Sequence, residues 1–151
     1  MLITAQTRLN AQKTNVTTKA KTNVKTSKAP MVFACLGKRC QRDGQISKAS
    51  FDSLLKEGIS AKDSFGKNYT VDGFSFSYGE RNLYEDSIGK LIILTDFLTE
   101  FCIGDTITPS IRNNIFFKTK AGDTAYFDQI KIVLPDGHKQ MVKSLRYILT
   151  K

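Results

Sequence analysis

The chain has 151 residues, of which 40% are hydrophobic, and its 23 basic and 14 acidic residues give a formal net charge of +9. This length and composition suit one folded domain. No apolar run approaches the roughly 18 residues of a membrane-spanning helix, so we expect no membrane span. Three cysteines and one histidine are too few and too unevenly spaced for a zinc site, so we expect neither a metal nor a cofactor. These residues are Cys35, Cys40, Cys102 and His138.

Residues 1–29 are rich in Thr, Lys, Asn and Gln and contain six basic residues and no acidic one. Such a segment buries too little apolar surface to offset the entropy of ordering it, so the sequence predicts a disordered basic tail. The rest of the chain has 17 basic and 14 acidic residues, which disfavours nucleic-acid binding by the folded part. The first residues, LITAQ, look like the end of a secretory signal peptide, and we expect the signal sequence to be absent or truncated.

Residues 30–151 are expected to form a single β-rich domain, which starts with the stretch MVFACLGKRC. This stretch is typical of a strand that enters a tight turn, with Cys35 and Cys40 on either side. Opposed residues of a hairpin come within reach of disulfide geometry, so these two cysteines are predicted to lie close enough to bond in an oxidising compartment. Cys102 lies in an apolar run and is expected to be a buried free thiol.

The stretch GQISKASFDSLLKEG predicts a helix that packs against a sheet. Ser47 and Ser50 are both possible N-caps, and Gly58 is the stop signal. The apolar residues that follow helical spacing are Phe51, Leu54 and Leu55.

In NYTVDGFSFSYG the apolar residues alternate with period two, but their phase changes at Gly73. A β-bulge at Gly73 would return all of these side chains to one buried face. A stacking surface for bases or sugars is the less favoured interpretation. The side chains concerned are Tyr69, Val71, Phe74, Phe76 and Tyr78.

The stretch GKLIILTDFLTEFCIGD is ambiguous, because short apolar runs fit a strand and a helix equally well. Leu91, Leu94, Leu98 and Phe101 follow helical spacing, and we interpret the second half of the stretch as helix. The next stretch, TPSIRNNIF, predicts a short helix with Thr108 as N-cap and Pro109 at the first helical position.

The C-terminal block predicts a hairpin. Its first strand has alternating Ile130, Ile132 and Leu134, its turn is Pro135-Asp136-Gly137, and its return strand has Met141, Leu145, Tyr147 and Leu149. His138 follows the turn and is expected to be exposed and not catalytic, since an exposed turn offers a base no shielding from water. A hydrolase built on His138, Asp136 and Ser144 is therefore the least favoured function.

Three stretches, in order, resemble the C-terminal domain of the GldM/PorM family of gliding-motility and type IX secretion proteins, over about residues 30–151. The matching positions are Gly44, Ile46, Ser47, Lys48 and Ala49, then Gly122, Asp123, Tyr126, Phe127, Asp128, Ile130 and Lys131, then Pro135, Asp136 and Gly137. The chain departs from the family pattern at Leu134, where the family usually has Gly, and over residues 84–104, for which the pattern has no counterpart.

The resemblance implies a mainly β, sandwich-like sheet domain with one or two short α-helices. It also implies a periplasmic or cell-envelope location and a non-enzymatic role in binding an envelope protein, with a homo-oligomer left open. No small-molecule substrate and no catalytic residue is expected. The alternative is a small basic nucleic-acid-binding protein that acts through residues 1–29.

Overall fold

The computed structural model describes residues 30–151, so the expected disordered tail of residues 1–29 lies outside the described residues. The expectation of a mainly β fold with one or two short helices is confirmed, and residues 30–151 contain two. Neither described helix has the length and apolar character to cross a membrane. The elements are β1 (Val32–Leu36), β2 (Gly44–Ser47), α1 (Lys48–Glu57), β3 (Ile59–Asp63), β4 (Asn68–Glu85), β5 (Leu91–Ile103), α2 (Pro109–Phe116), β6 (Thr124–Val133), β7 (Lys139–Met141) and β8 (Leu145–Thr150).

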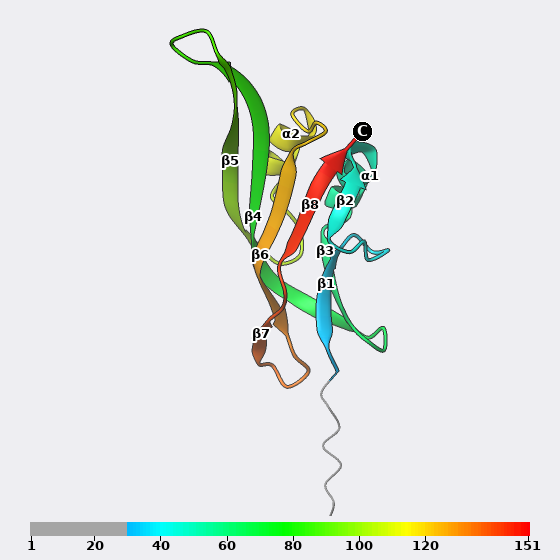
Figure 1. Ribbon diagram of the computed structural model, residues 1–151. Coiled ribbons are helices and arrows are strands. Elements are labelled where there is room, and N and C mark those ends of the chain that lie inside the picture. The colour runs from blue at the N-terminus through cyan, green and yellow to red at the C-terminus, as the bar shows by residue number, and fades with distance from the viewer. Residues whose placement is uncertain (1–29) are drawn as a thin grey trace, which may run out of the picture.

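The strands form one curled sheet in the order β1-β3-β4-β6-β8-β2. β5 pairs with β4 on the edge that β3 has left free, and β7 pairs with the end of β6. All these pairs are antiparallel except β2 with β8, which are parallel and bring Gly44–Ser47 beside the C-terminus. Figure 1 shows α1 and α2 behind the sheet, and the β4–β5 hairpin extending past all other strands.

The predicted bulge at Gly73 is confirmed by two register shifts between β4 and β6. One shift leaves Asp72 of β4 as an extra residue, and the other leaves Gln129 of β6, which has a positive φ of 50°. The two bulges compensate each other, so the alternation of buried side chains is kept on both strands. Four of the five predicted side chains are buried, whereas Tyr69 is only partly buried.

The core lies between the inner face of the sheet and the two helices. Phe127 of β6 is fully buried at its centre, with ring centroids 5.0 Å from Phe76, 5.8 Å from Phe74 and 5.9 Å from Tyr147. Phe51 of α1 covers Tyr147 from the helix side, at 6.5 Å. These aromatic contacts tie β4, β6, β8 and α1 into one core.

Helix α1 begins and ends where the sequence predicts. The Ser47 hydroxyl accepts a hydrogen bond from the Ser50 backbone N–H at 3.2 Å, so Ser47 is the N-cap, and Gly58 follows the last turn with a φ of 81°. The predicted helix at Pro109 is confirmed as well. The Thr108 side chain does not cap it, however, because its hydroxyl donates to the Glu100 carboxylate at 2.9 Å instead.

The helical interpretation of the second half of GKLIILTDFLTEFCIGD is wrong, because nearly the whole stretch is the long strand β5. Apolar side chains lie on both faces of the hairpin and therefore at consecutive positions, so the period-two pattern of a half-buried strand is lost. The residues that fit helical spacing divide between the two faces of this ladder, which has no register shift: Leu94 and Leu98 point to the inner face, and Leu91 and Phe101 to the outer face.

Two hairpin turns, those at either end of β4, have nearly the same sequence, Asp63-Ser-Phe-Gly-Lys67 and Asp86-Ser-Ile-Gly-Lys90. In each, the first aspartate accepts hydrogen bonds from the backbone N–H groups two and four residues later, at 2.9–3.0 Å. Gly66 and Gly89 have φ near 80°, as the fourth position of this turn requires. The shared turn therefore stands at both ends of β4.

The C-terminal hairpin is confirmed, but its return strand is interrupted. β7 and β8 pair with different parts of β6, and residues 142–144 between them are in neither strand. Leu145, Tyr147 and Leu149 are buried as predicted, whereas Met141 is 52% exposed because it pairs with Lys131 and shares its outer face of the sheet.

Candidate interaction surface

The most unusual surface of the described chain is the outer half of the β4–β5 hairpin. β6 pairs with β4 only as far as Gly79, so over residues 80–96 β4 pairs with β5 alone. We call residues 80–96 the arm. A two-stranded hairpin is at best marginally stable in water when nothing covers it.

The arm exposes apolar side chains on both of its faces. Successive side chains of a strand point to opposite faces. Leu83, Leu91 and Ile93 point to the outer face, away from the helices, and are 57–63% exposed, while Tyr84 and Leu94 point to the inner face and are more than 40% exposed. At the tip, Ile88 is 85% exposed. Contiguous exposed apolar surface of this kind marks interaction sites in soluble proteins.

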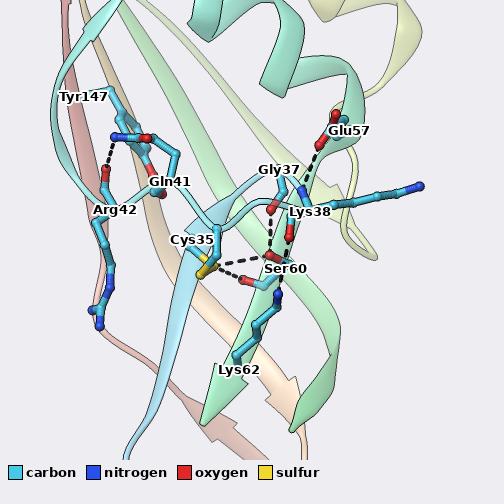
Figure 2. Close-up of a disulfide and its surroundings, with 10 residues drawn as sticks. Cys35, Gly37, Lys38, Gln41, Arg42, Glu57, Ser60, Lys62 and Tyr147 are labelled. Atoms are coloured by element: carbon cyan, nitrogen blue, oxygen red, sulfur yellow. Dashed lines mark hydrogen bonds between the residues drawn. A yellow bond between two sulfur atoms is a disulfide. The ribbon is translucent and has the colours of Figure 1, made fainter. Parts of the chain in front are cut away.

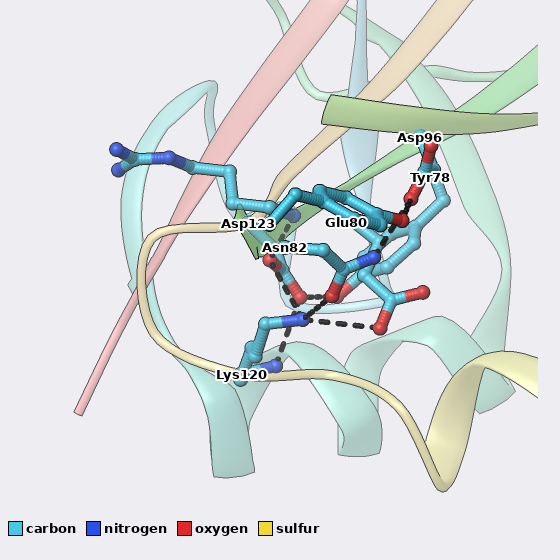
Figure 3. A network of polar contacts seen from close by, with 8 residues as sticks. Tyr78, Glu80, Asn82, Asp96, Lys120 and Asp123 are labelled. Carbon is cyan, nitrogen blue, oxygen red and sulfur yellow. Dashed lines mark hydrogen bonds and ion pairs between the residues drawn. The ribbon is translucent and has the colours of Figure 1, made fainter. Parts of the chain in front are cut away.

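The root of the arm is fixed by the buried carboxylate of Asp123, on the loop before β6 (Figure 3). Asp123 accepts hydrogen bonds from the Tyr78 hydroxyl, from the Arg81 backbone N–H at 2.9 Å and from the Lys120 backbone N–H at 3.1 Å. Burial raises the pKa of Tyr78, and the hydrogen bond to Asp123 raises it further. The phenol therefore stays protonated as a donor, and β4 is held where it leaves the core.

The same polar contacts continue along the inner face of the arm. The Lys120 ammonium donates to Glu80 and to the Asn82 carbonyl oxygen, both at 3.0 Å. The Asn82 amide in turn donates to Asp96 at 2.8 Å, and the Tyr84 hydroxyl donates to the same oxygen at 2.7 Å (Figure 3). These two hydrogen bonds lower the pKa of Asp96 below its ordinary value. The network holds the two strands of the arm in one orientation.

A recess of about 240 Å³ lies where the inner face of the hairpin meets α2. Its lining joins apolar Leu98 and Ile115 to polar Glu80, Asp96 and Lys118. A single side chain of a partner fits a space of this size, so the recess extends the surface of the arm toward the core.

The predicted proximity of Cys35 and Cys40 is confirmed, since they form a disulfide with Cα atoms 4.8 Å apart (Figure 2). The turn between them is bound to the body at two points. Gly37 N–H donates to the Gly58 carbonyl at 2.8 Å, and Lys38 N–H donates to the Glu57 carboxylate at 2.8 Å. This disulfide is therefore part of the packed structure.

Cys102 is fully buried and is a free thiol, as predicted. Burial raises its pKa to about 11, and the nearby Glu100 carboxylate adds to the effect. A thiol with so high a pKa stays protonated at neutral pH and is a poor nucleophile.

His138 lies on the exposed turn where the sequence places it, with its side chain 82% exposed. Its Nδ1 atom is 3.0 Å from an Asp136 oxygen, and within residues 30–151 the side chain has no hydroxyl or thiol partner. Hydrogen bonds from the backbone N–H and the imidazole of His138 lower the pKa of Asp136. Ser144 is exposed in the break after β7, so the geometry does not assemble the hydrolase site considered from the sequence.

No group of three or more potential His, Cys, Asp or Glu metal ligands occurs in the described part of the chain. The arm itself was missed by sequence reasoning, which left the partner-binding residues unassigned. The signal that could have found it is the repeat of the Asp-Ser-x-Gly-Lys turn at residues 63–67 and 86–90.

No protein-family model matches the chain, and no curated protein matches it either.

Proposed function

We propose that the chain is a non-enzymatic protein-interaction domain of the bacterial cell envelope, which binds an envelope protein through the arm. The observation that carries this proposal is the exposure of apolar side chains on both faces of the arm, with the polar network holding it in place. Fixed loops and hairpins on a rigid sheet are common sites of recognition.

The envelope location rests on two observations. The first is the resemblance of the three quoted stretches to the terminal domain of GldM/PorM proteins. The second is the Cys35–Cys40 disulfide, because disulfides persist in oxidising compartments and are rare in the cytosol. The nucleic-acid alternative depends on residues 1–29, which lie outside the described residues.

The two nearly identical turns supply a matched test. Ile88 at the tip of the arm and Phe65 at the other end of β4 occupy the same position of the turn, and both are 85% exposed. A photo-cross-linking phenylalanine analogue would replace each one in turn in the full chain, produced in the bacterium that makes it. Cross-linked partners would be identified by mass spectrometry.

We expect the analogue at Ile88 to capture a protein of the envelope fraction that the analogue at Phe65 does not capture. Equal capture from both positions, or capture from neither, would contradict the role of the arm. Recovery of nucleic acid with the chain in place of protein would favour the alternative function.

A further inference from the structure

The outer edge of β5 is the longest free strand edge in the described chain. β5 has 13 residues, and no strand within residues 30–151 pairs with its outer edge. The other edges are shorter: they belong to β1, β2 and β7, which have five, four and three residues, and to residues 80–85 of β4 beyond its last pair with β6. Natural proteins usually protect long edges with proline, lysine or a bulge. β5 contains no proline and no lysine, and its ladder with β4 has no register shift.

The backbone groups on this edge can be assigned from the two ends of the ladder. Asp86 N–H donates to the Lys90 carbonyl, and Gly104 N–H donates to the Asp72 carbonyl. In an antiparallel pair, hydrogen-bonded and non-hydrogen-bonded positions alternate, so even-numbered residues of β5 bond to β4. The odd-numbered residues from Leu91 to Ile103 therefore point their N–H and C=O groups outward.

The side chains of these odd-numbered residues all lie on the outer face, and their order is self-complementary about the middle residue, Phe97. A two-fold axis through Phe97 places Leu91 opposite Ile103, Ile93 opposite Phe101 and Thr95 opposite Thr99. We propose that the free edge of β5 pairs with β5 of a second copy of this chain, in antiparallel register centred on Phe97. This proposal rests on the proposed function, and it names a second copy of the chain as one protein that binds at the β4–β5 hairpin.

The inner face of the strand is compatible with this register. Asp96 meets Leu98 of the other copy, and Glu100 meets Leu94, so no acid stands directly opposite an acid. Both acids are also engaged within their own chain, Asp96 with Asn82 and Glu100 with Thr108. In an isologous contact two copies present the same residues to each other, so the strand must be self-complementary. A contact with an unrelated partner has no such requirement.

The side chain at the centre leaves the edge open. Phe97 lies over Gly79, where an added Cβ would be only 3.0 Å from its ring, and its ring centroid is 6.3 Å from that of Tyr126 on β6. The ring thus leans across β4 toward β6, away from the free edge of β5.

The first test removes one outward N–H group. Thr95→Pro deletes a donor that makes no bond within the chain, and proline is tolerated where a strand's N–H faces solvent. Thr95→Val keeps the donor and is the matched control. In sedimentation equilibrium on the full chain, we expect wild type and Thr95→Val to be dimers and Thr95→Pro to be a monomer with an unchanged near-ultraviolet circular dichroism spectrum.

The second test reads the register and does not depend on the proline variant folding. Thr95 of one copy faces Thr99 of the other at about 5.5 Å between Cα atoms, which suits a disulfide. Identical positions lie more than about 13 Å apart, four residues along the strand. A mixture of Thr95→Cys and Thr99→Cys chains should therefore form disulfide-linked dimers under mild oxidation, while each variant alone should not.

A wild-type chain that stays monomeric up to near-millimolar concentration would overturn the proposal. If the odd-numbered β5 amides of that monomer exchanged slowly, residues 1–29 of the same chain would be the partner of this edge. If they exchanged fast, the edge would be free to pair with a strand of another protein. Cross-linking of Thr95→Cys alone would overturn the register centred on Phe97. None of these results affects the cross-linking of an envelope protein to the analogue at Ile88, so the proposed function is tested independently.

Discussion

Phe76 and Tyr84 lie on the same face of the same strand, β4, yet Phe76 is fully buried while Tyr84 is 41% exposed. Over the first part of the strand, β6 pairs on one side and the helices cover the inner face. Over the arm, only β5 accompanies it and both faces are open. The alternation of side chains is the same in both parts, so the covering elements decide whether an apolar residue builds the core or a surface for a partner.

Alanine substitution on the two halves of β4 gives the largest expected contrast. Phe76→Ala should lower the free energy of unfolding by about 3–5 kcal/mol, because it leaves a cavity beside Phe127. Leu83→Ala should change it by no more than about 0.5 kcal/mol. Urea titrations with both midpoints and slopes would measure this. Equal losses would mean that the arm is packed within the monomer.

The junction between the two halves should respond to loss of the Asp123 charge. Asp123→Asn weakens the hydrogen bonds from Tyr78 and from two backbone N–H groups in a buried site, with an expected cost of about 1.5–3 kcal/mol. Hydrogen exchange of the arm amides should accelerate with it. Asp96→Asn removes an exposed charge from the same network and should cost less stability than Asp123→Asn. Unchanged arm exchange in Asp123→Asn would show that the network does not anchor the arm.

Replacing both Cys35 and Cys40 with Ser affects the opposite side of the molecule from the arm. A disulfide that closes so short a loop should contribute about 2 kcal/mol to stability. Exchange of the arm amides should not change, since the turn contacts α1 and β3 and not the arm. Reducing agent should lower the unfolding midpoint of wild type to that of the variant and leave the variant unaffected. Faster exchange in the arm would contradict the separation of the two regions.

The smallest expected effect is on the pH dependence of stability, which should differ between substitutions in the two turns of β4. Burial raises the pKa of Asp63, but hydrogen bonds from Lys67 and Phe65 lower it by more, so the net pKa is below the ordinary value. A depressed pKa in the folded state gives stability that is present above the unfolded value, about 3.9, and is lost as the pH falls through the folded value. The deficit of Asp63→Asn relative to wild type should therefore be full near neutrality and shrink in acid.

Asp86→Asn is the matched variant of that experiment. Asp86 has the same two backbone donors but is only partly buried, and it lacks the tyrosine hydroxyl that Asp63 accepts at 3.2 Å. Its deficit at neutral pH should be the smaller of the two. Urea midpoints measured across the acidic range would give both curves, and a deficit of Asp63→Asn that is independent of pH would contradict the carboxylate's role.

Local signals in the sequence were sufficient for much of the fold. The caps of α1, the phase change at Gly73, the spacing of Cys35 and Cys40 and the turn before His138 each have a short-range physical cause. The predictions built on them are confirmed because neighbouring residues alone determine those structures.

The arm and its anchor could not be derived in this way. β5 has apolar residues at consecutive positions because both of its faces carry apolar side chains, and this pattern mimics a buried strand or a helix. Tyr78 and Asp123 are separated by 45 residues, and their contact depends on how β4 and β6 meet in space. Such a contact follows from the register of the sheet, which a short stretch of sequence does not determine.

The 18 residues of β4 also have a mechanical consequence. A pull on the tip of the arm along the strand would load the β4–β6 hydrogen bonds together in shear, whereas a sideways pull would open them one after another. The arm is therefore stiff along its own axis and compliant across it. A tether attached at this tip would pass tension directly through the centre of the sheet to the turn at residues 63–67.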